Sequence, residues 1–170
     1  LKNKEVQDQE IDVITGAAGA IPVLLGIYHI EKEQSLLDAA IKSGDFLMEK
    51  VVEKDNVCFW QSVGADNGLT GYSHGNAGIA GALLDLYVTT QEQRYYDVAM
   101  KGFQYERNHF ISHLKNWPDL REDPNQPKQP NKPKHCAEMW CHGAPGMALA
   151  RFKAYQQTND PSFFEEVNHA

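Results

Sequence analysis

The sequence predicts an all-α fold built from repeated helical hairpins, and three observations lead to this prediction. A short pattern of glycine, two residues, glycine and an apolar residue occurs three times in the 170 residues, with gaps of 59 and 68 residues. Apolar residues at helical spacing follow each copy of the pattern. A second helix-like segment then follows each of these. One supersecondary unit repeated at a nearly constant period is typical of helical solenoids and closed α/α barrels.

The first helix of each unit begins at one copy of the glycine pattern. The copies are Gly16-Ala-Ala-Gly19, Gly75-Asn-Ala-Gly78 and Gly143-Ala-Pro-Gly146. Apolar residues spaced by three and four positions form one buried face of a helix. These stripes are Ile21, Leu24, Leu25 and Tyr28, then Ile79, Leu83, Leu84 and Tyr87, then the weaker set Met147, Ala150, Arg151 and Tyr155. We assign all three stripes to the core.

A second helix completes each unit. Its apolar positions are Leu36, Leu37, Ala40, Ile41, Phe46 and Leu47 in the first unit, and Tyr95, Tyr96, Ala99 and Phe103 in the second. Ser35 is the predicted N-cap of the first, and Thr90 and Gln93 have capping-box spacing before the second. Asp160-Pro161 opens the third, with proline at the first helical position. The predicted hairpins cover about residues 12–56, 71–115 and 141–170.

Two segments are not expected to be helical. Residues 57–70 combine a short apolar run with glycine and asparagine, which predicts a brief strand and a turn. Residues 117–135 hold five of the eight prolines and form a long predicted loop. Such a loop either lines a substrate groove or is a tolerated surface insertion.

The special residues recur at the same point of each unit, which favours a closed α/α arrangement in which they converge. Three helix N-termini at one end of the array would form a weakly positive floor. His74 and His142 each precede the first glycine of their copy, and Thr15 takes this position in the first copy, three residues after Asp12. Asp12 either orients a histidine or caps a helix, and His74 is either a structural residue or one that faces the shared cavity.

Composition excludes several classes of protein. The net charge of −7 argues against general nucleic-acid binding, and no apolar run is long enough to span a membrane. Three cysteines at these spacings do not form a disulfide framework, which favours a cytoplasmic setting. Cys58 is expected to be a buried, inert thiol. Leu1 at the start and a helix-like segment at the end suggest a piece of a longer chain.

Cys141 stands at the predicted start of a helix, where a thiol is readily ionised. A thiolate at that place is a good zinc ligand or nucleophile. A single Cys-His pair is weak evidence for zinc, because a zinc site needs three or four ligands. The residues alone therefore leave both a metal site and a structural role open.

Together, four motifs resemble the lanthionine synthetase C-like family. They are Asp12-Val-Ile-Thr-Gly-Ala-Ala-Gly19, Gly71-Tyr-Ser-His-Gly-Asn-Ala-Gly-Ile79, Asn116-Trp-Pro-Asp-Leu-Arg121 and Trp140-Cys-His-Gly-Ala-Pro-Gly146. The third motif, and Ala150-Arg151 after the last, are most similar to the cyclase domain of the bifunctional class II lanthipeptide synthetases. The resemblance covers nearly the whole chain, residues 1–170, as an N-terminal portion of such a domain.

This resemblance implies an α/α toroid of seven inner and seven outer helices, of which about two and a half hairpins are present here. It implies Cys141 as a ligand of Zn²⁺, with the remaining cysteine and histidine ligands beyond Ala170. His74 matches the catalytic histidine and Asp12 an acidic residue near it. The motif-supporting residues are Trp140, His142, Gly143, Gly75 and Gly78. Stand-alone cyclases often carry arginine four residues before the zinc cysteine, where this chain has Ala137.

The implied activity is zinc-dependent formation of lanthionine and methyllanthionine, by addition of peptide cysteine thiols to dehydroalanine and dehydrobutyrine in lanthipeptide (lantibiotic) biosynthesis. The implied substrate is a dehydrated precursor peptide, and a dehydratase domain is expected before this one. Without the remaining ligands, the isolated chain is expected to be inactive. The alternatives are a non-catalytic α/α-toroid protein that binds thiols or peptides, and an α/α-barrel glycoside hydrolase, which needs a pair of acids.

Overall fold

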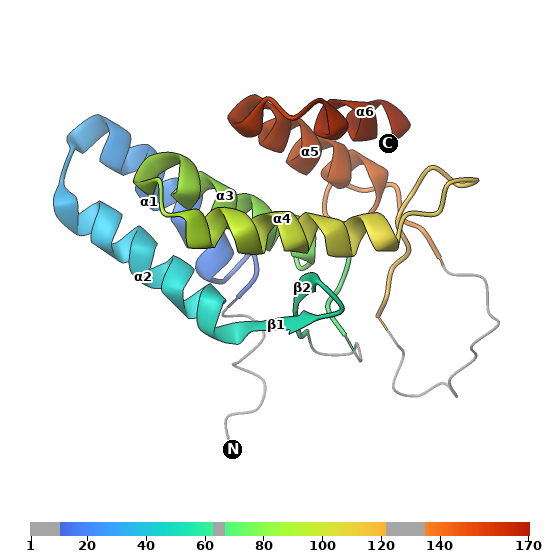
Figure 1. Cartoon of the computed structure of the whole chain (residues 1–170), viewed down its shortest axis with the longest axis horizontal. Helices are drawn as coiled ribbons and strands as arrows, with labels where there is room; N and C mark the ends of the chain where they lie inside the picture. Colours follow the sequence, from blue (N-terminus) through green and yellow to red (C-terminus); the bar gives the residue numbers. More distant parts are fainter. Residues whose placement is uncertain (1–10, 63–66, 122–134) are drawn as a thin grey trace, which may run out of the picture.

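The structure is a computed structural model that describes residues 11–62, 67–121 and 135–170. These residues form three helical hairpins (Figure 1). The hairpins are α1 (Ala17–Glu31) with α2 (Gln34–Lys50), α3 (Asn76–Thr90) with α4 (Gln93–Asn108), and α5 (Ala144–Thr158) with α6 (Pro161–His169). The first helices pack side by side, α1 on α3 and α3 on α5. The predicted all-α fold of repeated hairpins is confirmed.

The first helices of the three units have the same length and end in the same way. Each has 15 residues and ends in a residue with left-handed backbone conformation. The N–H of that residue donates to the carbonyl of the tyrosine four positions earlier, which satisfies one of the last helical acceptors. The pairs are Lys32 with Tyr28, Gln91 with Tyr87, and Asn159 with Tyr155. The sequence repeat is therefore a repeat of helix geometry as well as of composition.

The second glycine of each pattern allows one close backbone approach. A Cβ atom there would lie 2.0 Å from the carbonyl oxygen of the residue six positions earlier. The pairs are Gly19 with Val13, Gly78 with Tyr72, and Gly146 with Trp140. The loop before each helix folds back over the first helical turn, and only glycine leaves room for it. This contact brings the loop that carries the candidate site residues against its helix.

Replacing Gly78 with alanine is expected to destabilise the protein by about 3 kcal/mol, because the loop carbonyl must move away from the new Cβ. Gly81 lies in the same helix with nothing within 4 Å of its would-be Cβ, so Gly81→Ala is the matched control. That control is expected to be stabilising by up to about 1 kcal/mol. Pulse proteolysis in urea of the full-length protein measures both. Equal stability of the two variants would contradict this account of the repeat.

A two-stranded antiparallel sheet follows the first hairpin. It consists of β1 (Val51–Lys54) and β2 (Val57–Trp60), joined by Asp55 and Asn56, both with positive φ as a type I′ turn requires. The sequence predicted one strand near 57–70 and missed β1, because its only apolar residues, Val51 and Val52, directly continue a helical pattern. Trp60 is buried, and its indole N–H donates to the carbonyl of Leu47.

Two of the three predicted helix starts were wrong. The N-cap of α2 is Glu33, so Ser35 lies inside the first turn. Thr90 is the last residue of α3, where its hydroxyl donates to the Leu86 carbonyl, and the N-cap of α4 is Glu92. The third prediction is confirmed: Asp160 is the N-cap of α6, its side chain accepts from the N–H of Ser162, and Pro161 is the first helical residue.

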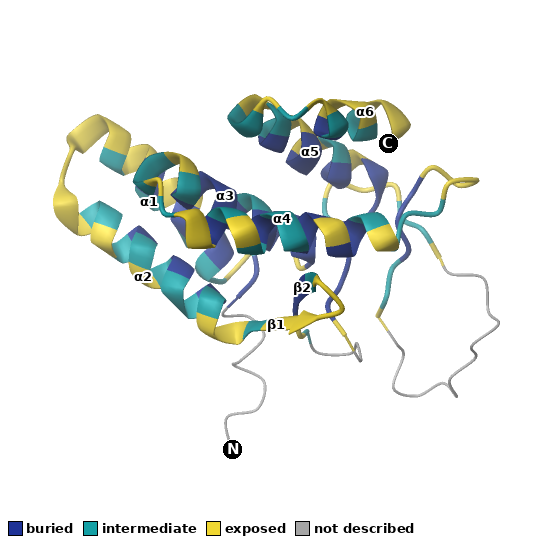
Figure 2. Ribbon diagram, viewed as in Figure 1, coloured by how far each residue is buried: buried dark blue, intermediate teal, exposed yellow. Residues whose placement is uncertain are grey.

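The core lies between the helices, along the faces where α1, α3 and α5 meet their partners (Figure 2). The predicted stripe of α3 is buried at Ile79, Leu83 and Leu84. Cys58 is fully buried, and burial raises the pKa of its thiol to about 11, in agreement with an inert cysteine. Most of the proline-rich loop, residues 122–134, lies outside the described residues. No helix in the described ranges has the length and apolar character needed to cross a membrane.

Candidate functional site

The loops that precede α1, α3 and α5 meet at one place and are joined by backbone hydrogen bonds. The N–H of Val13 donates to the Ser73 carbonyl at 3.0 Å. The N–H groups of Tyr72 and Ser73 both donate to the Cys141 carbonyl, at 3.1 and 3.2 Å. Three segments far apart in the sequence thus form one connected surface at the helix N-termini. The convergence expected from the repeat is seen in the structure.

Asp12 and His74 form a hydrogen-bonded pair across two of these loops. The Nδ1 atom of His74 lies 2.6 Å from Oδ2 of Asp12. The Asp12 side chain is 7% exposed and that of His74 45% exposed, so a buried carboxylate holds one edge of an accessible imidazole. Oδ1 of Asp12 accepts from the backbone N–H of Thr15 at 2.8 Å. Asp12 therefore contacts the histidine, as one of the two alternatives predicted, and it closes a turn in the loop without capping α1, whose N-cap is Gly16.

Cys141 and His142 lie on the third loop, beside this pair. Cys141 is a partly exposed free thiol. His142 is buried, and its ring centroid lies 6.3 Å from that of His74. Burial lowers the pKa of His142, and the charge of Arg121 lowers it further, so the ring is neutral at pH 7. Its Nε2 atom makes no hydrogen bond to any described residue. A buried imidazole, one of whose nitrogens has no partner among the described residues, thus lies next to the exposed His74.

Asp119 and Arg121 form an ion pair near Cys141 and His142, which sequence reasoning did not place at the site. The Nε atom of Arg121 lies 3.0 and 3.1 Å from the two carboxylate oxygens of Asp119. Burial raises the pKa of Asp119, but the hydrogen bonds from Arg121 outweigh it, and the pKa is lowered. Arg121 interacts electrostatically with both Cys141 and His142. The Asn116–Arg121 motif was the signal, although its role was not evident from spacing.

Asn116, at the start of that motif, fixes the position of the third loop. Its Oδ1 atom accepts from the N–H of Ala144, the first residue of α5, at 2.8 Å. Its Nδ2 atom donates to the carbonyl of Ala137 at 3.0 Å. The turn between them carries Gly143, with φ of +92° and a would-be Cβ 1.7 Å from the Ala137 carbonyl oxygen. The sharp turn that presents Cys141 thus depends on this glycine and this amide.

The remaining motif residues support the site through backbone and packing. Gly75 is the N-cap of α3, and Gly78 receives the loop carbonyl described above. Trp140 is 54% exposed, and its ring meets that of Tyr72 edge-on, with centroids 6.5 Å apart. An exposed indole beside the thiol gives the site an apolar rim.

The described residues do not make a complete metal site. Among them no group of three or more histidine, cysteine, aspartate or glutamate side chains is arranged to hold a metal ion. A tetrahedral zinc site needs three or four such ligands. Cys141 has a thiol of the kind that binds zinc, and at least one further ligand would have to come from outside the described part of the chain.

The sequence is similar to one protein family and to a lantibiotic biosynthesis protein. The family model described as lanthionine synthetase C-like protein matches residues 1–170. The lacticin 481/lactococcin biosynthesis protein LcnDR2 of Lactococcus lactis subsp. lactis is 27% identical over 142 residues. This alignment covers 84% of the chain and 13% of that protein.

Solved structures share the fold at lower identity. A GH76 α-mannanase of Bacteroides thetaiotaomicron superposes with a TM-score of 0.62 at 17% identity, over 90% of this chain and 41% of that one. The cellobiose 2-epimerase of Spirochaeta thermophila gives 0.64 at 13% identity, over 95% and 43%. Both are α/α toroids, so the predicted class of incomplete α/α toroid is confirmed. At these identities the likeness is one of fold alone.

Proposed function

Because the chain belongs to the lanthionine synthetase C-like family, we propose that it forms part of an enzyme that closes thioether rings in a peptide. The observation that carries this proposal is the Asp12–His74 pair beside Cys141, at the meeting point of three helix starts. The relative named for lacticin 481 biosynthesis supports a peptide substrate. The chain spans only 13% of that relative, and a dehydratase domain that prepares the peptide is proposed for the parent protein.

The proposed reaction is an intramolecular addition. The thiolate sulfur of a peptide cysteine attacks the β-carbon of dehydroalanine or dehydrobutyrine and forms the C–S bond. The π electrons of the alkene move to the carbonyl and form an enolate. Protonation of the α-carbon then completes lanthionine or methyllanthionine. Overall the C=C bond is replaced by one C–S bond and one C–H bond, and no atom is lost, because the proton released by the thiol balances the proton delivered to the α-carbon.

His74 is the proposed proton donor. Its Nδ1 edge is held by Asp12, which leaves Nε2 to face the accessible side of the ring. A carboxylate on one imidazole nitrogen fixes the tautomer and orients the ring for acid–base catalysis at the other nitrogen. The His142 ring lies beside His74, and the charges of Asp119 and Arg121 both act on His142. The exposed Trp140 is proposed to contact the peptide.

Zinc is proposed as the group that makes the substrate thiol reactive in the complete protein, with Cys141 as one ligand. A bound zinc ion stabilises a thiolate near neutral pH. The partly exposed Cys141 thiol supports this role, and the other ligands would lie outside the described residues.

The experiment uses the full-length protein, a dehydrated precursor peptide and mass spectrometry after thiol alkylation, which counts unclosed cysteines. We expect the wild-type protein to convert all ring-forming cysteine thiols of the peptide into thioethers, and we expect it to contain zinc. Cys141→Ala is expected to lose zinc and ring closure, whereas Cys136→Ala, the matched control, retains both. Full zinc content in Cys141→Ala would refute the ligand assignment. A precursor peptide whose cysteines all remain free after reaction with the wild-type protein would refute the function.

No observation favours the glycoside hydrolase alternative. Such enzymes need two acids that flank the sugar bond. Asp12 is bound to His74 and Thr15, and Glu138 lies exposed on the turn before Cys141. The similarity to the mannanase and the epimerase is therefore a similarity of scaffold.

A further inference from the structure

Glu106 is a fully buried carboxylate on α4 that reaches the loop carrying His74. Its Oε1 atom accepts two backbone hydrogen bonds, from the N–H of Gly71 at 3.2 Å and from the N–H of Ala77 at 2.8 Å. Those two amides stand on either side of His74, three residues away in each direction. One oxygen atom thus holds both ends of the turn that presents the imidazole.

Other hydrogen bonds also hold this turn: the N–H groups of Tyr72 and Ser73 donate to the Cys141 carbonyl, and the N–H of Asn76 donates to the Leu69 carbonyl. Gly71 has a φ of +116°, and the backbone then passes through His74 into the first turn of α3. The first N–H groups of a helix have no acceptor within the helix, and the Ala77 N–H is one of these. Glu106 supplies that missing acceptor and, through the same atom, ties down the start of the loop.

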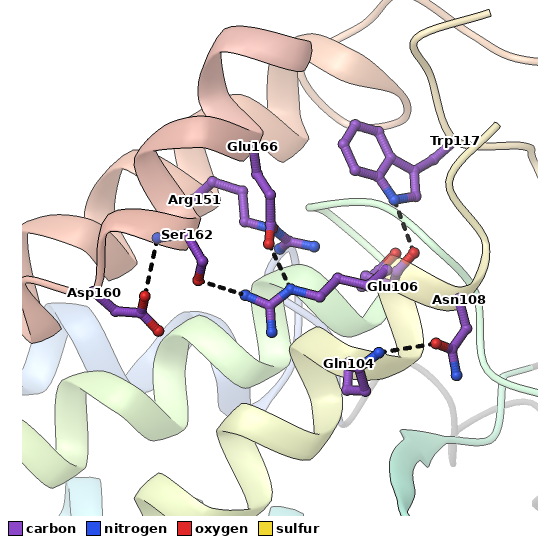
Figure 3. A network of polar contacts seen from close by, with 9 residues as sticks. Gln104, Glu106, Asn108, Trp117, Arg151, Asp160, Ser162 and Glu166 are labelled. Atoms are coloured by element: carbon purple, nitrogen blue, oxygen red, sulfur yellow. Dashed lines mark hydrogen bonds and ion pairs between the residues drawn. The ribbon is translucent and has the colours of Figure 1, made fainter. Parts of the chain in front are cut away.

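Glu106 is itself held by groups from two other segments (Figure 3). The indole N–H of Trp117 donates to the backbone carbonyl of Glu106 at 2.9 Å. Arg151 of α5 is fully buried and interacts electrostatically with the carboxylate. Burial raises the pKa of Glu106 to about 8, and the charge of Arg151 and the two N–H donors oppose this rise. In either protonation state Oε1 remains a hydrogen-bond acceptor.

We infer that Glu106 is a positioning residue for the Asp12–His74 pair: it sets where the imidazole stands, without touching the substrate. This inference rests on the proposed function for its kinetic consequence but not for its structural one. Proton transfer is sensitive to placement, and a shift of about 1 Å can reduce a rate by roughly 100-fold. Arg151 of the third hairpin interacts with Glu106, so the packing of that hairpin is expected to affect the position of His74 as well.

The test compares two substitutions in the full-length protein. Glu106→Asp keeps the carboxyl group but is one methylene too short to reach both amides. Glu106→Gln keeps the length and an acceptor oxygen and replaces the carboxyl group with an amide that cannot ionise. Glu165→Asp, at an exposed position of α6, is the matched control. Three quantities are measured: hydrogen–deuterium exchange of peptides covering 69–79, kcat and KM of ring closure, and the rate at which diethyl pyrocarbonate acylates His74.

We expect Glu106→Asp to speed exchange at Gly71 and Ala77 by at least about tenfold while the peptides of α1 and α5 stay unchanged. Its kcat should fall by at least about tenfold at nearly constant KM, with a changed acylation rate of His74. Glu106→Gln should have a kcat close to that of the wild type and should keep the slow exchange at Gly71 and Ala77. A uniform rise in exchange over the hairpins, or a Gln variant as impaired as the Asp variant, would overturn the inference.

The exchange and acylation measurements separate this inference from the proposed function. If the wild-type protein closes no rings, the proposed function fails, while local loss of protection and altered His74 reactivity in Glu106→Asp still support positioning. If wild-type ring closure is normal but Glu106→Asp changes neither exchange nor kcat by more than twofold, the function stands and the positioning role is refuted.

Discussion

Replacing His74 with alanine in the full-length protein is expected to slow ring closure by about 10²–10⁴-fold, the range that a positioned acid–base group contributes. The physical reason is the geometry of the pair: Asp12 holds Nδ1 at 2.6 Å, and the other edge of the ring is accessible. The peptide is not expected to lose affinity, because His74 acts on the enolate formed after the substrate binds. The rate is measured by mass spectrometry of thiol-alkylated peptide over time.

The matched control for this prediction is His113→Ala. His113 is exposed in the turn after α4 and is not among the residues that meet at the three helix starts. It should close rings at the wild-type rate. A His74→Ala protein that is folded and equally fast would remove the acid–base role and leave the thiol- or peptide-binding alternative.

Replacing Arg151 with alanine is expected to destabilise the protein by about 3–5 kcal/mol, since it empties the space of a fully buried side chain and removes one cation from a partly buried ion-pair network. Arg151 is fully buried, its Nε donates to Glu166 at 2.5 Å, and its guanidinium stacks over Phe103 at 4.8 Å. Glu166 also accepts from Arg107 of α4, so one carboxylate joins the second and third hairpins (Figure 3). Without Arg151, both Glu166 and Glu106 lose a positive neighbour.

Arg94→Ala is the control for this second prediction. Arg94 pairs with Asp45 and Glu92 at the surface, where an ion pair contributes about 1 kcal/mol or less. Pulse proteolysis in urea compares the two variants with the wild type. If the loss in Arg151→Ala is no larger than in Arg94→Ala, the buried network does not hold the third hairpin in place.

The hairpin repeat was predictable because both of its signals are local. The apolar stripes follow helical spacing, and the glycines mark each start, so the order of helices could be read directly. The reason for the second glycine could not, because the carbonyl that it accommodates belongs to a loop whose path depends on the fold. Strand β1 was missed because Val51 and Val52 continue the helical apolar pattern of α2. The caps at Glu33 and Glu92 were missed because neither residue makes a side-chain capping hydrogen bond.

The candidate site was predictable to the extent that its residues lie in the repeat. His74 and His142 directly precede the first glycine of their copies, Cys141 comes one residue before His142, and Asp12 lies four residues before Gly16 of the first copy. Glu106 gave a weaker signal: it continues the apolar register of Tyr95, Ala99 and Phe103, where a carboxylate is unusual. Arg151 lies in the apolar stripe of α5 in the same way. Two opposite charges in core registers of different helices indicate a buried pair, but not which loop it supports.

The central claim is that Asp12 and His74 act as one unit at a site built from three helix starts. A double-mutant cycle on the rate of ring closure tests it most directly, with Asp12→Asn, His74→Ala and both together in the full-length protein. The account predicts that the double variant is no slower than His74→Ala alone, because the carboxylate acts only through the imidazole. Losses that multiply in the double variant would contradict it.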